Sequence, residues 1–389
     1  MPSTSLLHLL LLSLLPSTAL ALNLTFQVIP LSTQTHIAGV GAWLNLLTLS
    51  IAPLATHIVF GLAEPVVLAG RHPRWTDRLP HFNPISIAWR YFAIADRRIR
   101  AKCWDRADMA ACNAVFWDGE RWDGSEAAMI ASRRFVAKLP TNTYVSIVSG
   151  SSVATLAMAL QGVQAIAMIV SGAMADRSPH DNGLAGLFSY LAILGLSRLI
   201  PALWISNDYG YTDKGEWSSR RSGGQRGYVP ITHDAEGELS KVTRDMVLKR
   251  LHPVSNWRGF IYRGFVFWIG AAMVAVSLMS ILRGTAWQYP GASDEEKEAD
   301  SRHTISGVLQ LSMYGVLVPS MFLIHARYLA SGSTVIPCIQ SRWYKLFTGF
   351  LILLALAAFV VSAIETRVIP CGPSCGQYTT LPKEFDGCP

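Results

Sequence analysis

The sequence predicts an all-α protein in which six helices form a transmembrane bundle behind an N-terminal signal peptide. Three observations predict this fold class. The composition is 51% hydrophobic and 15% charged, whereas soluble domains carry about 25% charged residues. Six segments are long enough to cross a bilayer, which takes roughly 20 mostly apolar residues, and none of them contains Asp, Glu or Lys. The third observation is the uneven distribution of Lys and Arg, which gives the bundle a direction.

The six predicted spans follow one another along the chain with connections of very different length. Prolines inside three of them are expected to kink the helices and free backbone carbonyls. Arg198 and Arg263 lie near span ends, where a long side chain can extend to the membrane interface. The spans are residues 37–62, 145–174, 183–205, 260–282, 304–326 and 346–364.

The N-terminal segment has the pattern of a signal peptide. Residues 1–21 hold a short apolar run followed by Ala19-Leu20-Ala21, the small-residue pattern of a cleavage site. The leader has no Lys or Arg, so an uncleaved seventh helix is the alternative. Both interpretations place residues 22–36 on the outer side of the membrane. That segment contains Asn23, in the only Asn-x-Ser/Thr sequon, which we expect to be N-glycosylated.

The basic residues predict the orientation of the bundle. All but six of the 33 Lys and Arg residues lie in residues 63–144, 206–259 and 327–345, or at the span ends beside these connections. Basic residues close to span ends are retained in the cytoplasm. The three connections are therefore predicted to be cytoplasmic, facing anionic lipid headgroups, and both mature termini to lie outside. We expect an integral membrane protein of the secretory route, in the plasma membrane.

The predicted outer tail, residues 365–389, contains half of the six cysteines. They are Cys371, Cys375 and Cys388. An oxidising compartment favours disulfides, and an odd number leaves one thiol over or pairs it between chains. A Cys₃ metal site is the alternative, but no fourth ligand lies nearby in the sequence, and structural zinc sites use four. We therefore predict disulfides here, and no metal or cofactor in the protein.

The longest cytoplasmic connection, residues 63–144, is the predicted site for a protein partner. Within it, residues 85–102 form a basic amphipathic pattern in which aromatic and aliphatic residues alternate with arginines. Such a helix either lies in the headgroup plane of the membrane or packs inside a small cytoplasmic subdomain. The sequence does not distinguish these two arrangements.

The second cytoplasmic connection, residues 206–259, divides into two parts. Residues 214–228 are rich in Gly, Ser and Arg and predict a disordered linker. Residues 236–251 predict an amphipathic helix that ends before Pro253.

Polar side chains inside the spans are the candidate functional residues, because such side chains are costly in a bilayer. The sharpest hypothesis is a polar cavity lined by His57, Gln161, Gln164 and Arg198, which would hold a small anionic or zwitterionic solute. The alternative is ordinary hydrogen bonding between helices, worth about 0.6 kcal/mol per contact. We favour the alternative, since amides and lone histidines in helix bundles usually serve packing.

The sequence excludes several classes of function. It contains no HExxH, G-x-S-x-G, Walker or GxGxxG motif. No Lys lies in a span to hold retinal, and no Asp or Glu lies in the hydrocarbon core to relay protons. An enzyme is therefore the least favoured class, and we expect no nucleic-acid partner. The first hypothesis is non-enzymatic sensing or scaffolding through residues 63–144, and the alternative is a small-solute transporter or channel.

Two stretches of the chain carry a resemblance to known proteins. Residues 90–126, RYFAIADRRIRAKCWDRADMAACNAVFWDGERWDGSE, and residues 137–150, AKLPTNTYVSIVSG, resemble a cytoplasmic stretch and the following span of multi-pass integral membrane proteins of filamentous fungi. The resemblance covers only the middle part of the chain. It implies a multi-pass protein of a eukaryotic secretory membrane. That group has no assigned activity, so the resemblance implies no functional residue.

Overall fold

The computed structural model is mostly helical, as the sequence predicts. The structure describes residues 27–28, 40–63, 65–67, 72–117, 119–174, 184, 187–211, 245–285, 302–303, 305–331, 336–369 and 372–375. The signal segment, Asn23, the predicted linker 214–228, Cys371 and Cys388 lie outside these residues.

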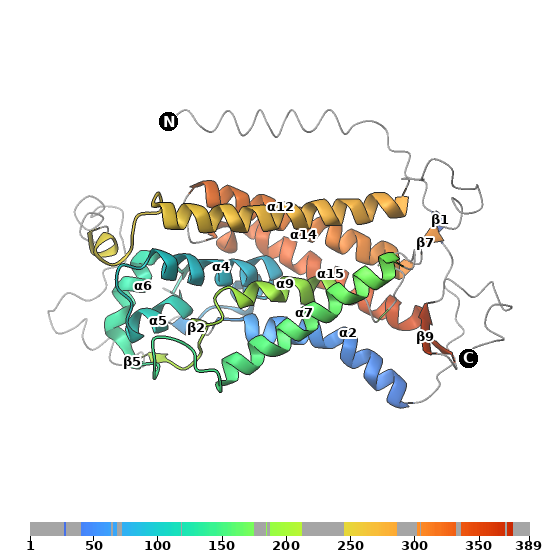
Figure 1. The fold of residues 1–389 in the computed structure, drawn as a ribbon, viewed down its shortest axis with the longest axis horizontal. Helices are drawn as coiled ribbons and strands as arrows, with labels where there is room; N and C mark the ends of the chain where they lie inside the picture. The colour runs from blue at the N-terminus through green and yellow to red at the C-terminus, as the bar shows by residue number, and fades with distance from the viewer. Residues whose placement is uncertain are drawn as a thin grey trace, which may run out of the picture.

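Five long helices run side by side along the length of the molecule (Figure 1). They have between 22 and 29 residues, which corresponds to roughly 33–44 Å at 1.5 Å per residue. Neighbouring pairs include α12 with α14, α14 with α15, and α2 with α7. The helices are α2 (Val40–Gly61), α7 (Gly150–Met174), α12 (Trp257–Thr285), α14 (Ile305–Ser331) and α15 (Arg342–Glu365).

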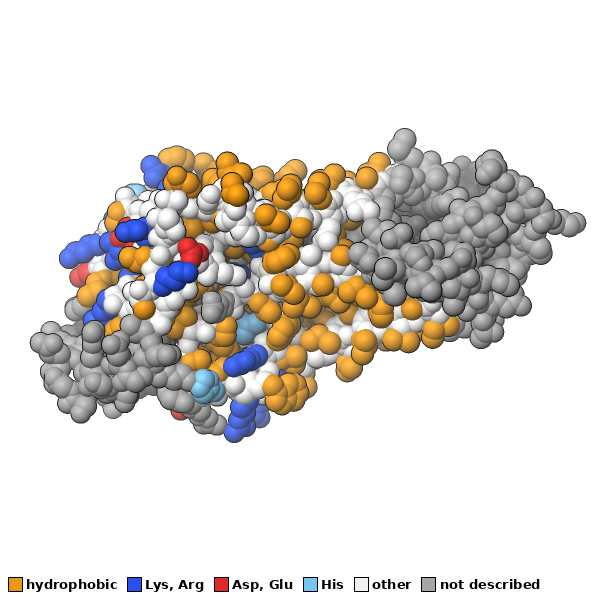
Figure 2. Space-filling view, turned by 90° about the horizontal axis from the view of Figure 1, so that it is seen from below, with side chains coloured by type: hydrophobic (Ala, Val, Ile, Leu, Met, Phe, Trp, Pro, Cys, Tyr) orange, Lys and Arg blue, Asp and Glu red, His pale blue; other side chains and the backbone are white. Residues whose placement is uncertain are grey.

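Two of the described helices are long and apolar enough to cross a membrane by length and composition. They cover Ile305–Ala330 and Arg342–Ile364, and most of their side chains are not buried inside the protein. Apolar side chains cover much of the face of the bundle seen in Figure 2, whereas Lys and Arg gather at one end of this face. The prediction of six spans is met in part, because among the described helices these two are long and apolar enough to cross a membrane.

In the described part of the third predicted span, the longest continuous helical stretch is short. It consists of α9 (Ser189–Gly195) and the 3₁₀ helix η4 (Leu196–Leu199), which pack against α7. Turns follow over residues 200–204. The helical hydrogen bonding ends close to Pro201, because a proline nitrogen has no hydrogen to donate. Pro53 and Pro319, by contrast, lie inside the continuous helices α2 and α14.

A small mixed subdomain lies at one end of the bundle (Figure 1). We call it the basic subdomain, and define it as the described part of residues 65–138 together with β6. Its strands form a sheet in the order β2-β3-β4, parallel then antiparallel, and a separate antiparallel pair, β5 with β6. Its elements are β2 (Pro65–Val67), α3 (Trp75–Arg78), η1 (Leu79–Phe82), α4 (Pro84–Arg100), α5 (Arg106–Asn113), β3 (Val115–Trp117), β4 (Trp122–Asp123), α6 (Glu126–Ser132), η2 (Arg133–Phe135), β5 (Val136–Lys138) and β6 (Gly210–Tyr211).

Local sequence sets the starts of the helices in the basic subdomain. Asn83 accepts a hydrogen bond from the backbone N–H of Ile85, and Pro84 occupies the first position of α4, where its missing N–H costs nothing. Asp105 and Asp108 form a reciprocal capping box at the start of α5.

Helix α4 is packed on all sides rather than lying in a headgroup plane. Twelve of its 17 residues are buried. One face, with Trp89 and Phe92, belongs to a core cluster that includes Tyr262 of α12. A second face, with Ile87 and Tyr91, packs in another cluster against α5 and α6. Helix α4 thus packs between α12 of the bundle and the rest of the basic subdomain, as a helix inside a small subdomain does.

The opposite end of the bundle carries two short strand pairs. β1 (Gln27–Val28) pairs in parallel with β7 (Arg302–His303). β8 (Thr366–Ile369) continues from α15 and pairs antiparallel with β9 (Gly372–Cys375). Cys375 therefore ends a strand of this hairpin.

Candidate functional site

The structure places two of the four candidate polar residues on α7. The side-chain oxygen of Gln161 accepts a hydrogen bond of 2.7 Å from the hydroxyl of Thr56, which joins α7 to α2. Gln164 is exposed on α7. The two amides are three residues apart on one helix, yet Gln161 is engaged with a neighbouring helix whereas Gln164 lies on the outer surface.

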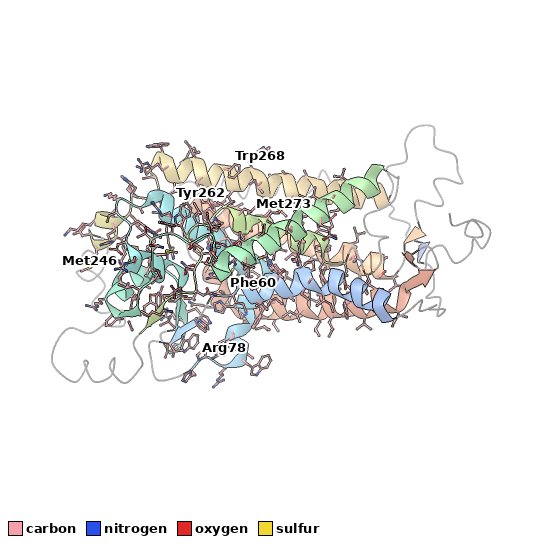
Figure 3. The ribbon with its side chains drawn as sticks, turned by 60° about the horizontal axis from the view of Figure 1, so that its bottom comes forward. Phe60, Arg78, Met246, Tyr262, Trp268 and Met273 are labelled. Carbon is pink, nitrogen blue, oxygen red and sulfur yellow. The ribbon has the colours of Figure 1, made fainter. Side chains whose placement is uncertain are left out.

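Arg198 lies at the centre of a contact between three helices. Its Nε donates to the hydroxyl of Thr155 at 2.9 Å and its Nη2 to that of Ser151 at 3.2 Å, both on α7. Its Nη1 donates to the carbonyl of Phe60 near the end of α2, a position labelled in Figure 3. Only 3% of Arg198 is exposed. The arginine therefore joins helices inside the protein and does not extend outward, as its position near a span end would also allow.

His57 faces an apolar cavity in the bundle. The cavity, of about 410 Å³, lies between α2, α9, α14 and α15 and has an almost entirely apolar wall. His57 is buried, and neither of its ring nitrogens has a hydrogen-bond partner. Among the four candidate residues, only His57 lines this cavity. Its lining includes Leu54, Phe188, Met313, Leu317, Leu351 and Phe359.

A buried network of charges joins the basic subdomain to the bundle. Asp96 of α4 is 0% exposed. It receives hydrogen bonds from the Nε of Arg100, at 3.0 Å, and from Nε and Nη2 of Arg263 on α12, at 3.0 and 3.1 Å. Arg100 also pairs with Glu126 and donates to the carbonyl of His252 at 2.9 Å. Two carboxylates thus balance two guanidinium groups.

Arg263 also points into the protein. Its position near a span end would allow the side chain to extend to a membrane interface. Instead only 6% of Arg263 is exposed, and it forms a two-point contact with Asp96. Paired N–H···O bonds between a guanidinium and a carboxylate are among the strongest in proteins. The pairing partner lies 167 residues away, so no local pattern reveals it.

A second charge cluster links the first and second basic connections. Arg250 donates to Asp105 at 3.2 Å and to Asp108 at 2.5 Å, and Arg133 pairs with both carboxylates. Burial opposes ionisation of Asp105, but the backbone N–H of Asp108 and the two arginines outweigh it and lower the pKa of Asp105. The cluster holds the residues before Leu251 against α5, beside the isolated bridge from Leu251 to Ala101.

A smaller cavity lies where α4 meets the end of α2. Its volume is about 90 Å³, and Arg90, Arg97 and His81 contribute to its wall. Arg90 donates from Nη1 to the carbonyls of Gly61 and Leu62, each at 2.8 Å. Its Nε and Nη2, the Nε of Arg97 and the Nε2 of His81 are buried without a hydrogen-bond partner. We call this space the arginine cavity.

The electrostatics of the arginine cavity differ from those of the charge network. Burial lowers the pKa of Arg90, and the nearby Arg198 acts in the same direction. Burial, with Arg90 nearby, lowers the pKa of His81 to about 4, so its ring is neutral at pH 7. No Asp or Glu is among the described residues that line the cavity. The arrangement suits a negatively charged group.

The sequence contains a signal for this cavity that its overall pattern hides. Arg90 and Arg97 are seven residues apart and so lie near one face of α4. Neither has an acidic residue three or four positions away, whereas Arg100 has Asp96 four positions before it. The amphipathic pattern of residues 85–102 groups all these arginines as one basic face.

Three cysteines lie in the basic connections. Cys103 is exposed, Cys112 and Cys338 are buried, and all three are free. Burial raises the pKa of Cys112, and raises that of Cys338 to about 11, so neither is a ready nucleophile. No group of three or more His, Cys, Asp or Glu that could hold a metal ion is found in the described part of the chain.

No protein-family model, curated protein or solved structure matches the chain. The resemblance of its middle part to fungal multi-pass proteins therefore stays a prediction.

Proposed function

We propose that the chain is an integral membrane protein with six spans, its basic subdomain in the cytoplasm and both mature termini outside. Two helices suited to cross a membrane and the apolar outer surface of the bundle support this proposal. The third span would include the short α9–η4 helix and its irregular ends. Irregular backbone is tolerated at membrane depth where protein buries it, and the adjoining Leu187 and Phe188 are almost completely buried.

Contacts between the three basic connections support the proposed orientation. Lys345 pairs with Asp77 at 2.6 Å, which joins the third connection to the first. Arg250 and Asp105 join the second to the first, as do Lys138 and Asp208. Connections that touch one another must lie on one side of a membrane. All three are rich in Lys and Arg, which favours the cytoplasmic side.

We infer that the protein senses or scaffolds without catalysis, through the basic subdomain. The observation that carries this proposal is the buried network of Asp96, Arg100, Arg263 and Glu126. Because the network ties α4 to α12, a displacement of the bundle helix would move the subdomain with it. Partial breakage would leave a buried charge without a partner, which is strongly unfavourable, so the two parts are expected to move together.

The edge formed by α3 and η1 is the surface that best suits a protein partner. Trp75 is 75% exposed, and Arg74 and Arg78 flank it. Arg78 projects from the edge of the molecule in Figure 3. Exposed tryptophan and arginine are typical anchors of protein interfaces.

Transport of a small polar solute is the weaker proposal. Gln161 and Arg198 bond to other helices, and His57 faces an apolar cavity. A hydrophilic solute would gain little from that wall.

Site-specific photo-crosslinking in cells tests the sensing or scaffolding proposal. We expect a photoreactive residue in place of Trp75 to give discrete protein adducts. The matched control replaces Leu160 of α7, which is 62% exposed on the bundle and should contact lipid only. Equal adduct patterns at both positions, or none at position 75, would contradict a partner at this edge.

A further inference from the structure

We propose that the arginine cavity binds an oxyanion, a single phosphate group, through Arg90 and Arg97. This inference gives the proposed sensor a ligand and rests on that function only for the cytoplasmic location of the site. The phosphate group belongs either to a soluble phosphate compound or to the headgroup of a lipid in the inner leaflet.

The strongest observation is that the cavity contains buried donors with no acceptor. Arg90 has two guanidinium nitrogens, Nε and Nη2, without a partner. Arg97 is 4% exposed; its Nη2 donates to the carbonyl of Gly124, while its Nε has no partner. Leaving such a donor without an acceptor costs more free energy when the group is charged than when it is neutral. An oxyanion would supply acceptors to several of these donors at once.

No described acidic residue balances the charge of the cavity. No carboxylate among the described residues pairs with Arg90 or Arg97. Besides burial, the groups that act on the pKa of Arg90 are Tyr209, Tyr91, Arg198 and Cys112, none of which is a carboxylate. Farther along the same helix, Arg100 has both Asp96 and Glu126. On α4, Arg100 therefore has acidic partners, whereas Arg90 and Arg97 have none among the described residues. A bound anion would balance the charge of these two arginines.

The end of α2 would oppose an anion if it were bare. The carbonyls at a helix C-terminus carry a partial negative charge. Here Nη1 of Arg90 covers the carbonyls of both Gly61 and Leu62. Its other donors are left for the ligand, so the same guanidinium shields the anion from the helix end.

The size of the cavity limits the ligand to one small group. About 90 Å³ is the space of roughly three water molecules, which is enough for a phosphate group but not for a whole nucleotide inside the cavity. The apolar side chains of Ile87, Trp89, Ile336 and Ile339 contribute to the wall. The remainder of a phosphate ester would therefore lie outside the cavity. His81 can donate from Nε2 as a neutral ring.

Thermal unfolding of the full-length protein in detergent, with increasing inorganic phosphate, tests the proposal. Chloride at equal ionic strength is the control for screening. We expect phosphate to raise the unfolding temperature of the wild type. Arg97→Gln should weaken the apparent affinity about tenfold or more. Arg98→Gln is the matched control, because Arg98 is its neighbour on α4 but lies over the rings of Trp104 and Trp204; it should bind as the wild type does.

Arg90→Lys keeps the charge but removes the forked donors, and should also weaken binding. If this variant does not fold, Arg97→Gln still decides the result. Stabilisation by phosphate that is the same in Arg97→Gln and Arg98→Gln would overturn the proposal, and so would its absence from the wild type in every arm.

Two further arms identify the source of the phosphate group. Glycerol 3-phosphate in detergent tests a soluble ester. Nanodiscs of phosphatidylcholine with and without phosphatidic acid test a lipid, by the amount of phosphatidic acid that the purified protein retains. Loss of binding in Arg97→Gln in either arm supports the site. Because these measurements need no partner protein, the phosphate site and the partner surface at Trp75 succeed or fail separately.

Discussion

Asp96 is the residue on which the contact between α4 and the bundle depends most. Its carboxylate accepts from Arg100 and Arg263 in a fully buried position. Removing one member of a buried charge pair leaves the other uncompensated, at a cost of about 3–5 kcal/mol. We therefore expect Asp96→Asn to lower the free energy of unfolding in detergent by an amount of this order, measured by denaturant titration.

An exposed ion pair provides the control for this prediction. The side chains of Lys138 and Asp208 are 68% and 47% exposed, and such pairs contribute about 0–1 kcal/mol. Lys138→Ala should therefore change stability little. If Asp96→Asn and Lys138→Ala have similar effects, the charge network does not hold the basic subdomain to the bundle.

For single residues, the sequence shows which polar side chains need a partner better than it shows which partner they find. It singles out Arg198 and Gln161 as costly polar groups inside spans, and both are engaged in bonds between helices. It does not predict the pairing of Arg263 with Asp96, because that contact depends on how distant helices pack. The sequence also does not show which arginines of α4 have acidic partners, because this depends on where carboxylates of other elements lie.

Among the helices, close packing at Gly162 makes the contact of α7 with α9. A Cβ atom at this glycine would lie 2.5 Å from Cγ of Leu196 and 2.9 Å from the backbone oxygen of Ala192. The backbone oxygen cannot rotate away, so the helices would have to separate. We expect Gly162→Ala to destabilise the protein by about 1–3 kcal/mol, measured as a lower unfolding temperature in detergent.

Gly264 of α12 is the matched control. A Cβ atom there meets nothing within 4 Å, and alanine is favoured over glycine in a helix by about 1 kcal/mol. Gly264→Ala should therefore leave stability unchanged or raise it. A loss at Gly264 as large as the loss at Gly162 would indicate a general effect of the substitution and not the contact between α7 and α9.

The length of an apolar segment predicts the observed helix well for most of the predicted spans. It predicts the helix poorly for the third span. Helix α2 covers residues 40–61 of the predicted 37–62, and α15 covers 342–365 around the predicted 346–364. Composition and length suffice where a helix is continuous. In residues 183–205 the composition is also largely apolar, but the helix is short and ends near Pro201. The mean hydropathy of a segment does not reveal the effect of a single proline, which removes one helical hydrogen bond.

On the scale of the whole molecule, the basic connections share one end of the bundle. Their ion pairs and the isolated bridge between Ala101 and Leu251 bring segments distant in sequence together. The pattern of Lys and Arg in the sequence anticipates this grouping, because charge retention during insertion acts on the whole chain. It does not reveal that the connections fold into a subdomain with its own buried core, since the core residues are scattered among arginines.

The exposed Cys103 provides a natural reporter of the proposed orientation. Cys112 and Cys338 are buried, so replacing the three tail cysteines by serine leaves Cys103 as the accessible thiol among those described. We expect a membrane-impermeant maleimide to label this variant only after cells are permeabilised, because the basic subdomain is proposed to be cytoplasmic. Adding Ser301→Cys, in a predicted outer connection, should give labelling on intact cells. Labelling of Cys103 on intact cells, abolished by Cys103→Ala, would reverse the orientation and would place the arginine cavity out of reach of cytoplasmic phosphate.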